Sequence, residues 1–244
     1  MPSEIEKKKS KTTDVISAVL EETLGQVVQG ITGLAASEKK DLVMSFSRVL
    51  RNLRGGQFLG VLKEEWDEMR EKGKIKEDYA TTDQGFSCLQ EILDFLEASA
   101  PDEKRFRAAK ALFFNIAQES MSDRAEILPL TLLKVLKQLD TTELVILFTA
   151  YRCYRANKPE YVKVTGAIEW SSIIAKESGL NYGSAVDLAE EKLTKLCLIG
   201  GRIYVDRSGM AETKTFRLTG LAIELCEFIA QQDPGLIFKE NEKI

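Results

Sequence analysis

Four basic side chains in the C-terminal part of the chain have a type and spacing that favour binding to phosphate groups. They lie on or beside two β-like runs, Arg202–Val205 and Thr215–Leu218, which flank the turn-forming residues Asp206–Gly209. Because guanidinium and ammonium groups neutralise phosphates, a hairpin carrying these side chains would be a candidate contact surface for nucleic acid. The four candidate residues are Arg202, Arg207, Lys214 and Arg217.

Other side-chain chemistry points away from catalysis. The chain contains no histidine, which excludes Ser-His-Asp and Cys-His catalysis, histidine-ligated zinc and HExxH proteolysis. The four cysteines are far apart and lack paired C-x-x-C spacing, so we expect buried, reduced thiols at Cys88, Cys153, Cys197 and Cys226. We therefore expect no enzymatic activity, catalytic residue, metal site or cofactor, and no small-molecule substrate is evident.

Two acidic clusters, 64–68 and Asp102–Glu103, could in principle hold a divalent cation or act as acid and base. Both are predicted to lie on helix surfaces beside lysine or arginine residues, so we interpret them as solvated helix faces. The Gly55–Gly56 pair lacks the G-K-[ST] sequence of a phosphate loop and is predicted to be a turn between two helices.

The elements that would position the basic hairpin follow a winged-helix order. A D-x-x-E start at Asp140 and Glu143 predicts a helix that ends near Asn157. A short strand at Tyr161–Val164 and a second helix at Ile173–Glu177, capped by Ser171 or Ser172, come next. A third helix at Tyr182–Leu196, the hairpin as the wing, and a last helix capped by Thr219 complete the order.

The third helix would be the recognition helix of such a module, and its charge matters. Its spacing is predicted to turn Val186, Leu188, Ala189, Leu193 and Leu196 inward. It is predicted to leave Ser184, Asp187, Glu190, Glu191 and Lys195 largely outward. Residues 171–229 contain seven Lys and Arg against eight Asp and Glu, so this region lacks the positive surplus that DNA binding favours.

The remaining chain is predicted to be helical. We expect a flexible tail at 1–13, a helical domain at 14–139, a winged-helix-like domain at 140–230 and a C-terminal tail at 231–244. The fold class is mainly α: a helical bundle followed by an α+β module with a small β-hairpin. The amphipathic segment 14–36, with glycines at Gly25, Gly30 and Gly33, is either a core helix or an exposed helix that binds a membrane surface or a partner.

Several short strings in the C-terminal half resemble the helical core of bacterial abortive-infection alpha-type proteins. They are 104–106, 111–116, 127–129, 133–140, 196–199 and 216–221. The resemblance implies a mostly helical protein of bacterial or prophage origin, with some relatives linked to defence against phage. It supplies no catalytic residue.

Three functions remain open from the sequence. The acidic third helix favours a protein partner or self-association. DNA binding through the basic hairpin is the second hypothesis, and a membrane-associated effector that uses 14–36 is the third. The net charge of −4 and the lack of a long apolar run favour a globular, cytoplasmic protein.

Overall fold

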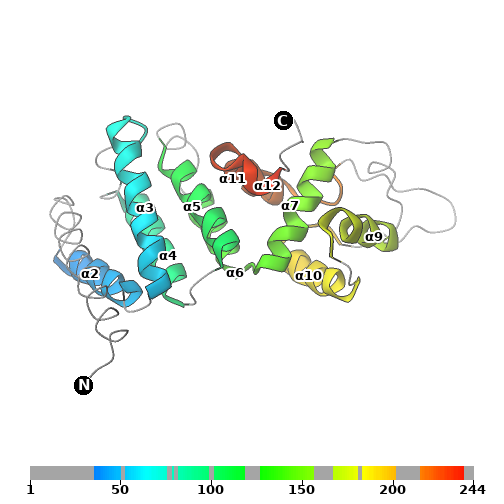
Figure 1. Ribbon diagram of the computed structural model, residues 1–244, viewed down its shortest axis with the longest axis horizontal. Helices are drawn as coiled ribbons and strands as arrows, with labels where there is room; N and C mark the ends of the chain where they lie inside the picture. Colours follow the sequence, from blue (N-terminus) through cyan, green and yellow to red (C-terminus); the bar gives the residue numbers. More distant parts are fainter. Residues whose placement is uncertain are drawn as a thin grey trace, which may run out of the picture. The chain divides into compact units, whose positions relative to one another are not determined.

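The computed structural model describes residues 36–50, 53–75, 79, 82–98, 102–118, 127–156, 167–180, 183–201 and 215–238. These residues are mainly helical, which confirms the mainly α prediction, and no strand occurs among them (Figure 1). The predicted strand Tyr161–Val164, the tail 1–13 and the segment 14–35 lie outside the described residues. The chain divides into two compact units, Met1–Pro101 and Asp102–Ile244.

The first unit contains α2 (Ala36–Leu50), α3 (Leu53–Glu71) and α4 (Asp83–Ala98). Helix α2 packs most closely on α4, and fully buried side chains fill the space between the helices: Leu42, Val49, Leu62, Ile92, Leu93 and Leu96. Figure 1 shows α3 and α4 side by side. Apolar residues at helical spacing predicted these three helices, and burial of those residues stabilises them.

The sequence predicted a turn at Gly55–Gly56, and this prediction is wrong because both residues lie inside α3. A Cβ atom at Gly55 would come within 3.0 Å of the Val49 carbonyl oxygen. The glycine is therefore needed for the close approach between the end of α2 and the start of α3 rather than for a turn. Gly73, with φ +65°, follows the end of α3 in the left-handed conformation that glycine adopts without strain.

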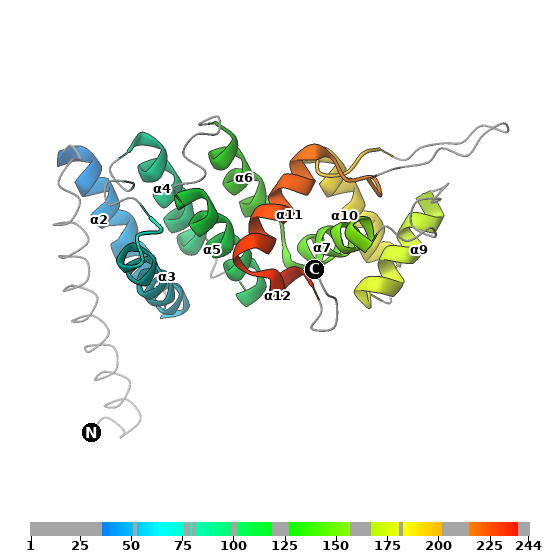
Figure 2. The same ribbon diagram turned by 90° about the horizontal axis from the view of Figure 1, so that it is seen from above.

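The second unit contains α5 (Glu103–Ala117), α6 (Ile127–Gln138), α7 (Thr141–Ala156), α9 (Ala167–Ser178), α10 (Gly183–Lys195), α11 (Gly220–Gln232) and α12 (Pro234–Ile237). Helix α5 packs on α6 and, most extensively, on α11 (Figure 2). Helices α7, α9 and α10 pack on one another. Helices α7, α9, α10 and α11 are the four helices that the sequence predicted in this region.

The division between the units differs from the predicted boundary at 139/140. Helix α5 belongs with the C-terminal helices because its polar side chains bind α11 and the residue after it. Arg107 Nε and Nη2 donate to the Asp233 carboxylate at 2.9 and 2.8 Å, and Asn115 Nδ2 donates to the Phe228 carbonyl at 3.0 Å. Within the segment 231–244, predicted as a C-terminal tail, the described residues contain the end of α11 and the short helix α12, and Ile237 is buried.

Local capping signals were read correctly at two helices. Glu143 N donates to Asp140 Oδ1 at 3.0 Å, and Asp140 N donates to Glu143 Oε2 at 2.7 Å, which is the reciprocal arrangement of a capping box. Thr219 Oγ1 accepts from Ala222 N at 3.2 Å and caps α11. Both caps satisfy helix-end amides that have no partner within the helix.

Helix α9 begins earlier than predicted. It starts at Ala167, so Ser171 and Ser172 lie inside it and do not cap it. The buried side chains of Trp170 and Ile174, one turn apart, form its inward stripe. The sequence-based assignment failed because it began the helix at the serines, whose capping preference is only a local signal.

Candidate interaction surface on helix α10

The two faces of α10 differ from the prediction at two positions. Val186, Ala189 and Leu193 are buried as expected, but Glu190 is buried with them at 3% exposure. Leu188, predicted to point inward, is 72% exposed. Positions 186, 189, 190 and 193 follow the i, i+3, i+4, i+7 spacing of one helix face, so position on the helix and not residue type decides which side chains are buried.

The inward carboxylate is neutralised by an arginine that the sequence had placed in the basic hairpin. Glu190 Oε1 and Arg217 Nη2 are 2.9 Å apart, and their side chains are only 4% and 5% exposed. Arg217 also donates from Nε and Nη2 to the Gly200 carbonyl, at 3.2 and 2.7 Å. A buried charge is costly unless it is paired and hydrogen-bonded, and here both partners meet that condition at these atoms.

The arginine also stacks on an aromatic ring. Its guanidinium carbon lies 4.7 Å from the centre of the Trp170 ring, and Trp170 Nε1 donates to the Phe216 carbonyl at 3.2 Å. Nη1 of Arg217 is buried with no hydrogen-bond acceptor in the described part of the chain. These contacts join α9, α10 and the residues before α11 around one guanidinium, so we name Glu190, Arg217, Trp170 and Gly200 the arginine clamp.

The residues around the clamp correct the second predicted β-like run. Phe216 and Arg217 have φ values of +52° and +68°, and Leu218 N donates to the Thr215 carbonyl at 3.0 Å, so 215–217 is a turn. Extended pairing is seen at an antiparallel bridge between Ile199 and Leu218. Gly200 N donates to the Arg217 carbonyl at 2.7 Å, and Thr219 N donates to the Leu198 carbonyl at 3.1 Å.

Of the four candidate nucleic-acid contacts, only Arg217 lies in the described part of the chain. Its guanidinium is used inside the fold by the arginine clamp. Arg202, Arg207 and Lys214 lie outside the described residues, as does the run Arg202–Val205. DNA contact through the hairpin therefore stays a prediction that depends on these three residues.

The outward face of α10 has no surplus positive charge. Lys195 Nζ lies 2.6 Å from Glu191 Oε1, and this hydrogen bond lowers the pKa of the Glu191 carboxyl. Lys192 Nζ lies 2.7 Å from Glu143 Oε2 on α7. Each lysine of α10 thus has a carboxylate partner, and Leu188 lies among Ser184, Asp187 and Glu191, which are exposed. We name this exposed surface the α10 outer face; it consists of Ser184, Asp187, Leu188, Glu191 and Lys195.

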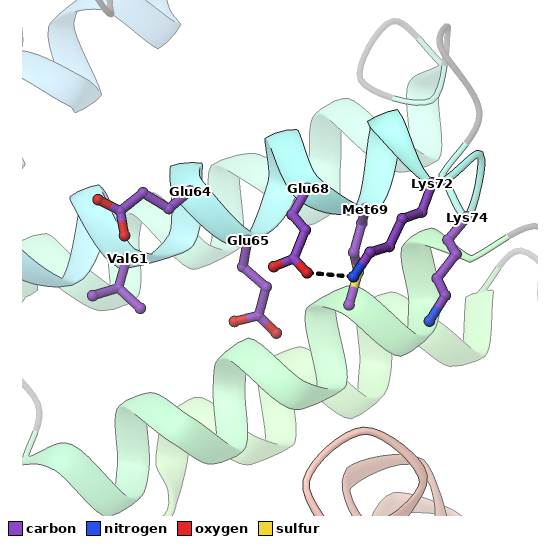
Figure 3. Close-up of a pocket in the computed structure, with 7 residues that line it drawn as sticks. All are labelled: Val61, Glu64, Glu65, Glu68, Met69, Lys72 and Lys74. Carbon is purple, nitrogen blue, oxygen red and sulfur yellow. Dashed lines mark hydrogen bonds and ion pairs between the residues drawn. The ribbon is translucent and has the colours of Figure 1, made fainter.

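A shallow hollow of about 340 Å³ lies against α3 in the first unit, where the sequence analysis had noted an acidic cluster (Figure 3). Lys72 pairs with Glu68, and its hydrogen bond lowers the pKa of the Glu68 carboxyl. Lys63 and Asp67 pair at 2.8 Å, also one turn apart. The hollow is lined by Val61, Glu64, Glu65, Glu68, Met69, Lys72 and Lys74. Within the cluster, Glu64 and Glu68 are exposed, and Asp67 and Glu68 have the basic partners that the sequence predicts.

The other acidic pair, Asp102–Glu103, is used for structure. Asp102 caps α5 by accepting from Arg105 N at 3.0 Å, and it also accepts from the Thr141 hydroxyl. Glu103 is an exposed residue in the first turn of α5. Among the described residues, no group of three or more His, Cys, Asp or Glu is arranged to hold a metal ion.

The cysteine prediction is confirmed at three positions and wrong at the fourth. Cys88, Cys153 and Cys226 are buried free thiols, and burial raises the pKa of Cys88 to about 11. Cys197 is also free but exposed, because it follows the end of α10 in a left-handed conformation with φ +56°. Its apolar neighbours in the sequence gave no sign of this exposure.

Comparison with known proteins adds no relative. No protein-family model, curated protein or solved structure matches the chain. The resemblance to abortive-infection proteins, with its link to phage defence, therefore stays a prediction. In the part of the chain that the structure describes, no helix combines the length and the apolar character that a bilayer crossing needs.

Proposed function

We propose that this chain is a protein-interaction module whose α10 outer face binds a protein partner. The observation that carries the proposal is that the Leu188 side chain is 72% exposed. It lies at the centre of the α10 outer face, between the exposed residues Asp187 and Glu191. An exposed leucine contributes to binding when a partner covers it and removes its apolar surface from water. The exposed leucine favours a partner that offers an apolar pocket.

The same face is poorly suited to nucleic acid. Phosphate binding requires lysine or arginine groups that can release counterions, and Lys192 and Lys195 already have carboxylate partners at 2.7 and 2.6 Å. A helix entering a DNA groove would also bring Asp187 and Glu191 close to phosphates, and like charges repel. A protein surface avoids both costs.

We also propose that the second unit is completed as a winged-helix-like module, with residues 202–214 as the wing. Two observations support this: the Ile199–Leu218 bridge pairs the chain on either side of the segment, and in the arginine clamp Arg217 binds both the Gly200 carbonyl and Glu190 of α10. In this proposal the module's recognition helix, α10, is used for protein binding, as fold and function are separable.

Site-specific cross-linking in the native cell tests the interaction. A photo-reactive amino acid replaces Ser184, which is exposed one turn before Leu188; the matched control replaces Glu71, an exposed helical position in the first unit. We expect a defined protein adduct from position 184 that is absent from position 71 and disappears in Leu188→Asp. Equal adducts from both positions, or adducts with nucleic acid alone, would overturn the proposal.

A duplex-DNA titration at several salt concentrations tests the alternative. We expect weak binding that Arg202→Ala, Arg207→Ala and Lys214→Ala together leave unchanged. If the chain instead binds duplex DNA tightly, with an affinity that drops steeply as salt rises and is lost in that triple variant, the basic hairpin is the binding surface. The protein-interaction proposal would then be replaced by a regulator that binds DNA.

A further inference from the structure

We infer that the neck beside α10 is a conformational latch, which the arginine clamp holds closed in a strained backbone conformation. The neck is defined as two short segments: 197–200, which follow α10, and 215–219, which precede α11. The inference concerns how the fold holds α10 and not what the helix binds, so it goes beyond the proposed function.

Backbone strain is concentrated in the neck. In the described part of the chain, every non-glycine residue with a positive φ lies here: Cys197 at +56°, Phe216 at +52° and Arg217 at +68°. This left-handed region is unfavourable for L residues with ordinary side chains, because the Cβ atom comes too close to the following carbonyl oxygen. Such residues persist where surrounding contacts hold them, and they are frequent in ligand clamps and switch regions. Strain in both segments of the neck therefore points to a conformational device.

Hydrogen bonds join the two segments across the neck. Gly200 N donates to the Arg217 carbonyl at 2.7 Å, and Thr219 N donates to the Leu198 carbonyl at 3.1 Å. Thr219 Oγ1 also donates to the Cys197 carbonyl at 2.7 Å. Two of the strained residues, Cys197 and Arg217, are themselves acceptors in these bonds. The pairing of the neck and its strain are therefore linked.

The arginine clamp adds a side-chain lock to this pairing. The Arg217 guanidinium reaches Gly200 in the opposite segment and Glu190 in α10, at 2.7 and 2.9 Å. Trp170 Nε1 donates to the Phe216 carbonyl at 3.2 Å, so α9 holds the other strained residue of the same segment. The bonds from the guanidinium form only while the neck is closed, and they favour that state.

Two features of the closed neck favour its opening. One is the backbone strain, which is relieved when Phe216 and Arg217 return to a common φ. The other is Nη1 of Arg217, which is buried with no acceptor in the described part of the chain and would gain one in water. Because these costs oppose a small set of contacts, we expect the neck to open as a local unit, at a free energy well below that of global unfolding.

Opening of the neck would also loosen α10. Leu198 N donates to the Leu193 carbonyl at 2.9 Å, and Cys197 N donates to the Thr194 carbonyl at 3.0 Å, so the first neck residues close the C-terminal end of this helix. Glu190 holds the inner face of α10 through the same arginine that locks the neck. The latch thus sets how firmly α10, and with it the α10 outer face, is held in place.

Native-state hydrogen exchange of the full chain tests the strain. The amides of Gly200 and Thr219 report opening, because both donate across the neck. Cys197→Gly removes the strain at an exposed position, and the matched control Cys197→Ala keeps a side chain in the left-handed conformation. We expect both amides to exchange about fivefold more slowly in the glycine variant than in the alanine variant.

A second pair of variants tests the clamp. Glu190→Gln keeps an acceptor for Arg217 and removes the charge, so the Gly200 and Thr219 amides should exchange together and about tenfold faster, while the amides of α5 keep their rates. The control Glu191→Gln changes the exposed neighbour and should leave the neck amides unchanged. If Glu190→Gln fails to fold, the comparison of the two Cys197 variants decides the matter.

Three results would overturn the inference. The first is equal exchange of the neck amides in Cys197→Gly and Cys197→Ala, and the second is unchanged exchange in a folded Glu190→Gln. The third is a wild type in which the Gly200 and Thr219 amides exchange only through global unfolding, with its full dependence on denaturant, because the neck would then have no opening of its own.

Discussion

The two faces of α10 differ in a way that residue type alone does not predict. A charged residue is buried on the inner face, and an apolar residue is exposed on the outer face. The inner face buries Glu190 and neutralises it with Arg217, whereas the outer face exposes Leu188 beside Asp187 and Glu191. A buried carboxylate with a matched partner serves the fold. A leucine left in water contributes little to the fold and is available for binding. The comparison therefore separates stability from recognition on a single helix.

The largest expected effect comes from breaking the arginine clamp. Glu190→Ala leaves the Arg217 guanidinium buried without its carboxylate, which should cost about 3–5 kcal/mol in the free energy of unfolding. Glu191→Ala, the next residue along the chain, should leave the urea midpoint close to that of the wild type because its side chain is 62% exposed. Urea unfolding followed by circular dichroism measures both.

A double variant then separates lost pairing from lost packing. If the loss in Glu190→Ala comes from the uncompensated charge, Glu190→Met combined with Arg217→Met should recover most of the stability, because no charge is then buried. Equal destabilisation by Glu190→Ala and Glu191→Ala would contradict the assignment of Glu190 to the interior.

A matched pair of leucines sharpens the same comparison. Leu193 is fully buried on the inner face, and Leu193→Ala should lower the free energy of unfolding by about 2–5 kcal/mol through the lost transfer energy and the cavity left behind. Leu188→Ala on the outer face should change it by less than about 0.5 kcal/mol. Thermal or urea unfolding of the two variants under identical conditions decides the point; a similar loss in both would mean that Leu188 is covered within the chain.

A smaller loss is expected at the start of α7, the helix on which the inner face of α10 packs. Asp140→Ala removes the acceptor for Glu143 N and should cost about 0.5–2 kcal/mol, typical of a helix N-cap. Asp140→Asn keeps an acceptor at that position and is the matched control, which should recover most of the loss. An unchanged stability in Asp140→Ala would show that tertiary packing alone holds this end of the helix.

The smallest effect on stability is expected from changing the exposed thiol of Cys197, whose reactivity can be measured directly. With a thiol reagent at pH 8, Cys197 should react first in the native protein, because the thiolate is the reactive form and only this cysteine is exposed. Burial raises the pKa of Cys88 to about 11, so this thiol should be almost fully protonated at pH 8 and react only after unfolding. Cys197→Ser should remove the fast phase, and a fast phase that persists would place another cysteine at the surface.

Local signals predicted the parts of this fold that depend on neighbours in sequence. The capping box at Asp140 and Glu143, the cap at Thr219 and the apolar stripes of most helices require only residues within a turn or two. The prediction failed where distant residues decide. The neutralisation of the Glu190 carboxylate depends on Arg217, and the placement of α5 with α11 depends on Asn115 and Arg107 reaching residues far along the chain.

The candidate site was predicted only in part. The sequence showed the acidic character of the third helix. It did not show which face two of its residues occupy: Glu190 was predicted to be outward and is buried, and Leu188 was predicted to be inward and is exposed. The helical positions 186, 189, 190 and 193 could have revealed both errors, since they form one stripe whatever their side chains. The inward use of Arg217 had no comparable sequence signal.

The most direct test of the account is one variant measured in two ways. Leu188→Asp, carrying the photo-reactive residue at position 184, is purified and unfolded in urea, and its cross-linked adduct is compared with that of the unchanged chain. We expect an unchanged free energy of unfolding together with loss of the protein adduct, because Leu188 acts in recognition and not in the core. A marked loss of stability, or an adduct that persists at full yield, would contradict it.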